Sequence, residues 1–252
     1  MLNILYIFII SFVQFFVFSS KVMAENLSYG CINPSLDQSY NQNVSGKNLI
    51  FSSPKYDPEK PHKLIIMLHG TNMNAGWMKS LAGYVEEFSS NSIFAYLDSG
   101  KSTWDVLGDL YLIDNVIDQM GNKYCVDLYQ VFIVGYSNGA FFANIIGQNR
   151  SRKIKAIVAV AGGGGGGTQI PAMIVHGRTD QLVSFWSGWN SMRNWAFTDH
   201  CIPPTNDDGY VGCEYLPQCQ YQVVWCPWNG NHDWPSWLHK EVWQFIDNVS
   251  KR

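Results

Sequence analysis

One serine lies in a sequence setting that suits a catalytic nucleophile. The pentapeptide GYSNG, residues 135–139, follows the apolar run 131–134 and precedes a helical segment that begins at Ala140. A strand, a sharp turn and a helix in this order form a nucleophile elbow, whose glycines allow the strand and the helix to approach closely. The turn lifts the hydroxyl above the sheet, beside the amino end of the helix, which favours negative charge. We therefore predict that Ser137 is a nucleophile.

A serine hydroxyl needs a base to remove its proton, and the base needs an acidic group to orient it. Where the serine stands on such an elbow, the acid and then the base follow it along the chain. Asp180 comes shortly after the apolar run 172–175, so we expect it at the same sheet edge as Ser137. The alternative is a solvated loop residue. Three later aspartates lie in a cysteine-rich segment and are poorer candidates: Asp199, Asp207 and Asp208.

Three histidines follow Asp180, and one of them is placed as a base would be. His232 lies on a loop between a predicted strand and the last predicted helix, at the same sheet edge. His239 falls inside that helix, where we expect a surface residue, and His200 stands away from any strand end. We predict that Ser137, Asp180 and His232 form a catalytic triad. The alternative for His232 is a structural role in its loop.

A triad also needs donors for the oxyanion that forms during acyl transfer. One donor is expected from the backbone N–H of Asn138, directly after the nucleophile. The second is expected from the loop after Leu68-His69-Gly70, at Thr71. We expect His69 to support that loop and His176 to brace the loop that carries the acid.

Strands and helices alternate along the chain. Apolar runs read as buried parallel strands at 64–67, 93–97, 131–134, 156–160 and 173–175. Helices are expected at 77–88, 107–120, 140–148, 185–196 and 237–249, the last with one apolar face. This alternation predicts an α/β fold with a doubly wound, mostly parallel sheet and helices on both faces. A run at 49–51 is expected to add an antiparallel edge.

Length and composition indicate one globular domain, which we place at residues 25–252. Apolar residues make up 46% of the 252 residues and charged residues only 15%, which is typical of a chain with a sizeable core. The net charge of −3 shows no strong basic bias, so we expect no nucleic-acid partner. We expect a monomer.

The chain begins with an apolar stretch that we interpret as a signal peptide. Val22 and Ala24 are small residues at the positions typical of a cleavage site, so we predict cleavage after residue 24, a secreted or periplasmic protein and no membrane contact afterwards. An uncleaved anchor is the alternative, because the stretch is at the lower length limit for spanning a bilayer.

Six cysteines follow the predicted signal peptide, and an even number in an exported chain indicates disulfides. We predict Cys31–Cys125 and Cys201–Cys219, which leaves Cys213–Cys226. A zinc site is the rival interpretation, although the chain has no closely spaced Cys-x-x-Cys pair. We expect neither a metal nor an organic cofactor.

Six consecutive glycines, residues 162–167, follow a predicted strand and should leave the sheet at its carboxyl edge. A phosphate loop is excluded because no Gly-Lys-Ser/Thr follows. Two interpretations stay open, a flexible connector and a mobile rim of the active site.

At these motifs the chain resembles the secreted feruloyl esterase and poly(3-hydroxybutyrate) depolymerase family of α/β-hydrolases. The similarity runs over residues 47–249, and it rests on Leu68-His69-Gly70 with Asn74, Trp104 before Asp109, residues 136–139, His176-Gly177 with Asp180, Trp195 with Cys201, and His232-Asp233-Trp234-Pro235. It implies the α/β-hydrolase fold and the same triad, with Trp104 and Trp234 expected to contact the substrate. The glycine run and the extra cysteines depart from the family pattern, which leaves the substrate open.

The expected activity is hydrolysis of a carboxylic ester, from a small molecule or a polymer, through an acyl-enzyme on Ser137. A hydroxycinnamate or related carbohydrate ester is the first candidate substrate, and a short-chain polyhydroxyalkanoate is the second. A catalytically inactive binding protein with the same fold is the third interpretation, which the complete triad argues against.

Overall fold

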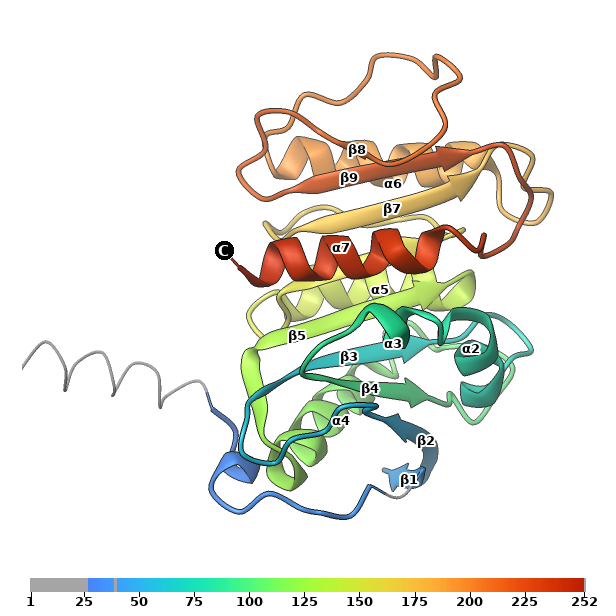
Figure 1. Ribbon diagram of the computed structural model, residues 1–252. Helices are drawn as coiled ribbons and strands as arrows, with labels where there is room; N and C mark the ends of the chain where they lie inside the picture. The colour runs from blue at the N-terminus through green and yellow to red at the C-terminus, as the bar shows by residue number, and fades with distance from the viewer. Residues whose placement is uncertain (1–26, 39, 252) are drawn as a thin grey trace, which may run out of the picture.

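The apolar runs of the sequence form strands of one sheet (Figure 1). The computed structural model describes residues 27–38 and 40–251, so the predicted signal peptide and its cleavage site lie outside the described residues. Nine strands of the described chain pair in the order β1-β2-β4-β3-β5-β6-β7-β9-β8. Their bounds are β1 Asn41–Val44, β2 Lys47–Ser52, β3 His62–Leu68, β4 Ser92–Leu97, β5 Val126–Tyr136, β6 Ala156–Val160, β7 Ala172–Gly177, β8 Glu214–Tyr215 and β9 Val223–Trp228.

The central strands pair in parallel from β4 to β9, whereas β1, β2 and β8 are antiparallel additions at the two sides. The predicted antiparallel edge at 49–51 is therefore confirmed as part of β2. Both faces of the central strands are buried, which explains why their sequences are continuously apolar and do not alternate with polar residues.

Helices cover both faces of the sheet, as Figure 1 shows with α7 in front and α5 and α6 behind. Alternate residues of β3 divide between two cores: Leu64 and Ile66 face the layer of α4, α5 and α6, and Ile65 and Met67 face the layer of α2, α3 and α7. The helices are the single turn η1 Tyr29–Cys31, then α2 Ala75–Ala82, α3 Val85–Phe88, α4 Leu110–Lys123, α5 Asn138–Arg150, α6 Phe185–Thr198 and α7 Leu238–Ser250.

Two predicted helices differ in their bounds. The segment 77–88 is two helices, α2 and α3, separated at Gly83 and Tyr84, and α2 starts early because the Asn74 side chain accepts a hydrogen bond from the Trp77 N–H. The segment expected at 107–120 becomes helical only at Leu110, since a turn closed by the Asp105 carboxylate precedes it. Local side-chain hydrogen bonds decide both boundaries.

The glycine run connects β6 to β7 without a helix. It crosses back over the sheet, beside α5 and α6, and four of its residues, Gly164 to Gly167, have φ between 85° and 95°. A Cβ on Gly165 would overlap the indole nitrogen of Trp195, and the Asn144 side chain binds both that indole and the Gly163 carbonyl. Positive φ values and a close approach to α6 therefore require glycine, and the run is a packed connector.

All six cysteines form disulfides, and the three predicted pairs are confirmed: Cys31–Cys125, Cys201–Cys219 and Cys213–Cys226. The first joins the amino-terminal arm to the start of β5. The other two hold residues 199–222, the segment between α6 and β9, and we call this the cysteine-rich excursion. Disulfide sulfurs do not act as thiolate ligands, so the zinc interpretation has no support from these residues.

Within the described part of the chain, no helix is both long and apolar enough to cross a membrane. The sheet with helices on both faces confirms the predicted fold class. Its carboxyl edge, where β3, β5, β7 and β9 end, carries the loops that hold His69, Ser137, Asp180 and His232.

Candidate active site

Ser137 stands on a strained turn between β5 and α5. Its φ of 54° and ψ of −118° lie in a region that non-glycine residues rarely adopt. A Cβ on Gly135 would overlap the carbonyl of Gly139, and a Cβ on Gly139 would overlap the carbonyl of Leu68. Both flanking glycines are therefore required where strand and helix cross, as the elbow motif predicts.

The structure brings the three predicted triad residues together. The Ser137 Oγ lies 2.8 Å from the His232 Nε2, and the His232 Nδ1 lies 2.7 Å from the Asp180 Oδ2. Because the carboxylate accepts a hydrogen bond from the Nδ1–H group, Nε2 carries no proton and can accept the one on the serine. The arrangement can carry out nucleophilic catalysis with a general base and an orienting acid.

Asp180 is a buried carboxylate with a full set of partners. Its Oδ1 accepts hydrogen bonds of 2.9 Å from the N–H groups of Leu182 and Val183, and its side chain has no exposed surface. Burial acts to raise the pKa of Asp180, but the hydrogen bonds from Val183, His232 and Leu182 outweigh it and hold the pKa below the usual value. The carboxyl group of Asp180 is therefore ionised near neutral pH.

His176 lies behind this carboxylate, as its expected bracing role requires. Its Nε2 is 3.0 Å from the Val183 carbonyl and 3.2 Å from the Asp180 Oδ2. A carbonyl only accepts, so Nε2 carries the proton. Burial lowers the pKa of His176, with the Val183 carbonyl and Asp180 opposing the shift, and a neutral imidazole fits these contacts.

The two predicted oxyanion donors flank Ser137. Asn138 is the first residue of α5, where a backbone N–H has no partner within the helix. Thr71 follows Gly70, and a Cβ built on Gly70 would lie 3.1 Å from the Ser137 Cβ, so this loop passes directly over the nucleophile. Within the described residues, neither N–H has a hydrogen-bond acceptor. Their role as donors stays a prediction.

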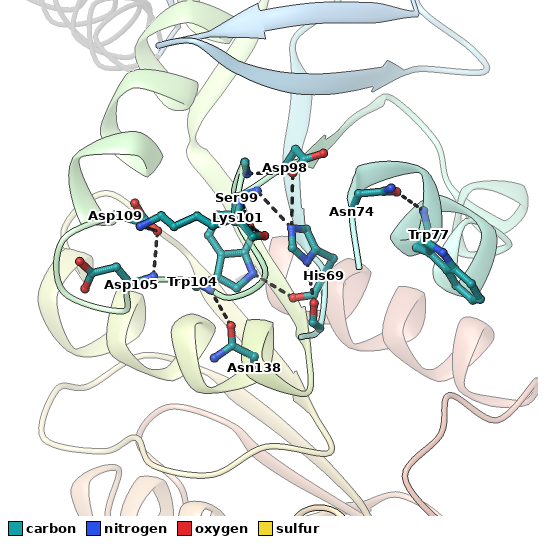
Figure 2. A network of polar contacts seen from close by, with 12 residues as sticks. His69, Asn74, Trp77, Asp98, Ser99, Lys101, Trp104, Asp105, Asp109 and Asn138 are labelled. Atoms are coloured by element: carbon teal, nitrogen blue, oxygen red, sulfur yellow. Dashed lines mark hydrogen bonds and ion pairs between the residues drawn. The ribbon is translucent and has the colours of Figure 1, made fainter. Parts of the chain in front are cut away.

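A polar network holds the loop that carries Thr71 (Figure 2). The Ser99 N–H donates to the His69 Nε2 over 3.1 Å, so the His69 Nδ1 carries the proton and donates to the Gly70 carbonyl over 2.7 Å. Burial lowers the pKa of His69, which favours this neutral form. The expected support by His69 is confirmed. The Asn72 N–H also donates to the Ser102 carbonyl, which ties the two loops together.

Trp104 belongs to the same network and is 4% exposed. Its indole N–H donates to the His69 carbonyl over 2.9 Å, and its backbone N–H donates to the Asn138 side chain over 2.7 Å. Its ring stacks on Phe142. Trp104 thus links the loop that carries Thr71 to the first turn of α5. The expectation that it contacts the substrate needs correction, because almost none of its surface is accessible.

Trp234 is also buried, with 5% exposure, and packs beside His239 in the core below α7. The expectation that Trp234 contacts the substrate directly needs correction for the same reason.

The expectation that His239 is a surface residue is wrong. Its exposure is 8%, and its ring nitrogens contact the carbonyls of Ser236 and Leu81. His239 therefore joins the His232 loop to the end of α2.

Sequence reasoning missed two residues that hold the loop of the predicted base, His232, in place. The Tyr136 hydroxyl donates to the His232 carbonyl over 2.9 Å, and burial, with the charges of Asp233 and Asp180, raises the pKa of Tyr136 to about 12. The Asn231 side chain accepts a hydrogen bond from the Gln181 N–H over 3.0 Å, which ties the loop of His232 to the loop of Asp180. The place of Tyr136 inside the pentapeptide was the only available signal for its role.

The loop that carries Asp180 is also attached to the cysteine-rich excursion. Arg178 binds Asp207 with two nitrogens, one over 2.8 Å, and its guanidinium lies 5.5 Å from the centre of the Phe185 ring. These contacts make Asp207 a structural partner of the loop and leave Asp180 as the residue that reaches His232.

Comparison with known proteins identifies relatives for this arrangement, although no family model matches the chain. Feruloyl esterase C of Emericella nidulans is 26% identical over an alignment of 226 residues that covers 82% of this chain and 83% of the relative. The acetyl xylan esterase from Aspergillus awamori has a TM-score of 0.64 at 14% identity and covers 84% of this chain and 97% of its own. Est1E from Butyrivibrio proteoclasticus, solved with ferulic acid bound, has a TM-score of 0.59 at 14% identity over 85% of this chain and all of its own.

Together these comparisons agree with the expectation drawn from the elbow and its accompanying motifs. The chain has the fold of the α/β-hydrolases, and its sequence is similar to that of a feruloyl esterase.

Proposed function

We propose that this protein is a secreted serine esterase that hydrolyses hydroxycinnamate or related carbohydrate esters through an acyl-enzyme. The observation that carries the proposal is the continuous chain of hydrogen bonds from Asp180 through His232 to the Ser137 hydroxyl, at 2.7 and 2.8 Å. The esterase relatives support the same reaction class.

In the first step the His232 Nε2 takes the Ser137 proton while the Ser137 oxygen attacks the ester carbonyl carbon. Asp180 keeps the imidazole in the required tautomer and stabilises its charged form. The negative charge moves to the carbonyl oxygen, where the N–H groups of Thr71 and Asn138 bind it. The C–O bond then breaks, and the alcohol leaves with the proton from His232.

In the second step water replaces the alcohol. The His232 Nε2 takes a proton from water, the hydroxide attacks the acyl-Ser137 carbon, and the acid departs as the proton returns to the Ser137 oxygen. The strained elbow keeps Ser137 at a fixed height above the sheet during both steps.

Exposed apolar side chains on the loop after Asp180 and on the first turn of α6 favour an aromatic acyl group. Leu182 is 78% exposed and Trp186 57% exposed, and the Leu182 N–H binds Asp180 directly. They offer the apolar contact that Trp104 and Trp234 do not, because those rings are buried. With relatives named feruloyl esterases, this surface ranks hydroxycinnamate esters ahead of polyesters.

The proposal is tested with methyl ferulate, short p-nitrophenyl esters and a polyhydroxybutyrate suspension as parallel substrates. We expect the highest kcat/KM on methyl ferulate and loss of all turnover in Ser137→Ala. Trp186→Ala should raise KM for methyl ferulate and leave the rate on p-nitrophenyl acetate nearly unchanged. Preference for the polyester would contradict the substrate assignment, and activity in Ser137→Ala would contradict the mechanism.

The three disulfides and the predicted signal peptide support secretion. Expression of the full chain with its own first 24 residues, followed by amino-terminal sequencing of the exported product, tests this part. A product that begins at Glu25 is expected, and a product that stays in the membrane fraction would contradict it.

A further inference from the structure

A concave surface lies at the amino edge of the sheet, opposite the candidate active site. It is a cavity of about 400 Å³ between the starts of β5, β6, β7 and β9 and the last turn of α7. We call it the amino-edge cleft. Ser137 follows the far end of β5, roughly 25 Å from Tyr129 at the rise per residue of a strand. The cleft therefore cannot serve the same ester bond as the triad.

The cleft combines an apolar floor with exposed aromatic rings. Ile154, Ile170 and Val249 line the floor and are each 4% exposed, whereas Tyr129 is 60% exposed and Tyr221 39%. A volume of this size lies within the range of small-ligand sites. Exposed tyrosines present a flat apolar face with a polar end, which suits the faces of sugar rings.

Side-chain amides supply polar groups beside the tyrosines. The Gln169 Nε2 donates to the Gln220 Oε1 over 3.0 Å, and the Gln222 Nε2 donates to the carbonyls of Leu216 and Val223. These bonds fix the amides and leave the Gln220 amino group and the Gln222 oxygen without a partner among the described residues. Donors and acceptors on adjacent residues match the hydroxyls of a sugar.

The cleft is positively charged in a chain whose net charge is −3. Its lining includes Arg152, Lys153 and Lys155 and contains no aspartate or glutamate. Lys153 pairs with Asp114 at 2.7 Å, but within the described residues Arg152 and Lys155 make no ion pair. Two cations without a partner beside amides and tyrosines fit a carboxylate-bearing ligand, for which Arg offers paired donors.

We propose that the amino-edge cleft binds an oligosaccharide that carries a uronic acid, with the sugar rings against Tyr129 and Tyr221 and the carboxylate at Arg152 and Lys155. This binding is separate from catalysis and does not depend on the triad. Its effect is to hold the enzyme on an acidic polysaccharide while the opposite edge of the sheet acts on esters.

Isothermal titration calorimetry with a glucuronic-acid-branched xylo-oligosaccharide tests the site, with the unbranched oligosaccharide and inorganic sulfate as comparison probes. We expect binding of the branched sugar, weaker binding of the unbranched one and none of sulfate alone. Arg152→Ala with Lys155→Ala, and separately Tyr129→Ala, should each weaken binding of the branched sugar roughly tenfold.

Matched variants outside the cleft control for general effects. Tyr111→Ala replaces a tyrosine that is 52% exposed on α4, and Lys60→Ala removes a lysine whose side chain is 62% exposed. Both should bind the branched sugar as the wild type does, and no variant should change kcat/KM on a soluble ester. The proposal is overturned if the branched sugar does not bind, if the unbranched sugar or sulfate binds equally well, or if the cleft variants keep wild-type affinity.

Discussion

Two aspartates flank helix α6, and both have side chains without exposed surface. Their carboxylates differ in their hydrogen-bond partners. Asp180, five residues before α6, receives four polar contacts, two from backbone N–H groups and two from histidines. Asp199, the residue after α6, is 0% exposed, and neither of its carboxylate oxygens has a partner within the described residues. Burial alone raises the pKa of Asp199 to about 7, and its place at the carboxyl end of a helix also disfavours negative charge.

The contrast shows that burial alone does not distinguish Asp180 from Asp199; their hydrogen-bond partners do. The pKa of Asp180 is below its usual value, so ionised Asp180 stabilises the fold above the ordinary pKa of Asp, and this contribution is lost as the pH falls through the folded value. The pKa of Asp199 is above its usual value, so the folded state holds a proton that the unfolded chain has lost. Asp199 therefore reduces stability progressively as the pH rises from about 4 to 7.

The largest effect is expected when Asp180 is replaced. Asp180→Asn keeps the size of the side chain but removes the charge and favours the wrong tautomer of His232, so kcat should fall by about 10⁴. Asp199→Asn and Asp208→Asn are the matched controls, because neither aspartate contacts the triad, and both should keep nearly full activity. Steady-state kinetics on a soluble ester measures all three. If Asp180→Asn stays active while a control loses activity, the acid is misassigned.

The next largest effect concerns the glycine run that packs against the second half of α6. Gly165→Ala places a Cβ on the Trp195 indole at a φ of 95°, and it should destabilise the protein by about 3 kcal/mol. Gly164→Ala has a similar φ of 85° but meets no atom within 4 Å, so about 1 kcal/mol is expected. Urea unfolding of both variants separates backbone strain from the clash. Equal losses would mean that contact with α6 is unimportant.

A smaller effect of opposite sign is expected at Asp199. Removing the charge of an unpartnered buried carboxylate should stabilise the protein by roughly 2 kcal/mol at pH 8, after the cost of burying an amide. At pH 4 the wild-type group is protonated in the folded state, so Asp199→Asn should be little more stable than the wild type. The difference in unfolding midpoint between the two proteins, measured from pH 4 to 8, should therefore grow with pH. A difference that does not vary with pH would show that Asp199 has a partner.

The main features of the site could be predicted because they depend on local order along the chain. The elbow needs a strand, two glycines and a helix, and all of these are visible in residues 131–140. Asp180 and His232 could be placed because parallel strands end at one edge, so a residue just after a strand must lie there. Disulfides were expected from the even number of cysteines, and the third pair, Cys213–Cys226, was left by elimination.

Other features depended on packing that no pattern reveals. Trp104 and Trp234 were expected at the substrate because they belong to the motifs that resemble the esterase family, yet their rings fill the core beside the loops. His239 was expected at the surface because it is polar, but two backbone carbonyls give its ring a buried place. The glycine run gave no periodic signal, since its conformation is set by Asn144 and Trp195 on two separate helices.

The most direct test of the triad is labelling with a fluorophosphonate probe, followed by peptide mapping. The probe reacts with an activated serine hydroxyl, so the account predicts one labelled residue, Ser137. Asp180→Asn should label far more slowly than wild type, and Asp199→Asn should label at the wild-type rate. Labelling of a different serine, or no labelling of the folded wild-type protein, would contradict the assignment of Ser137 as a nucleophile activated by His232 and Asp180.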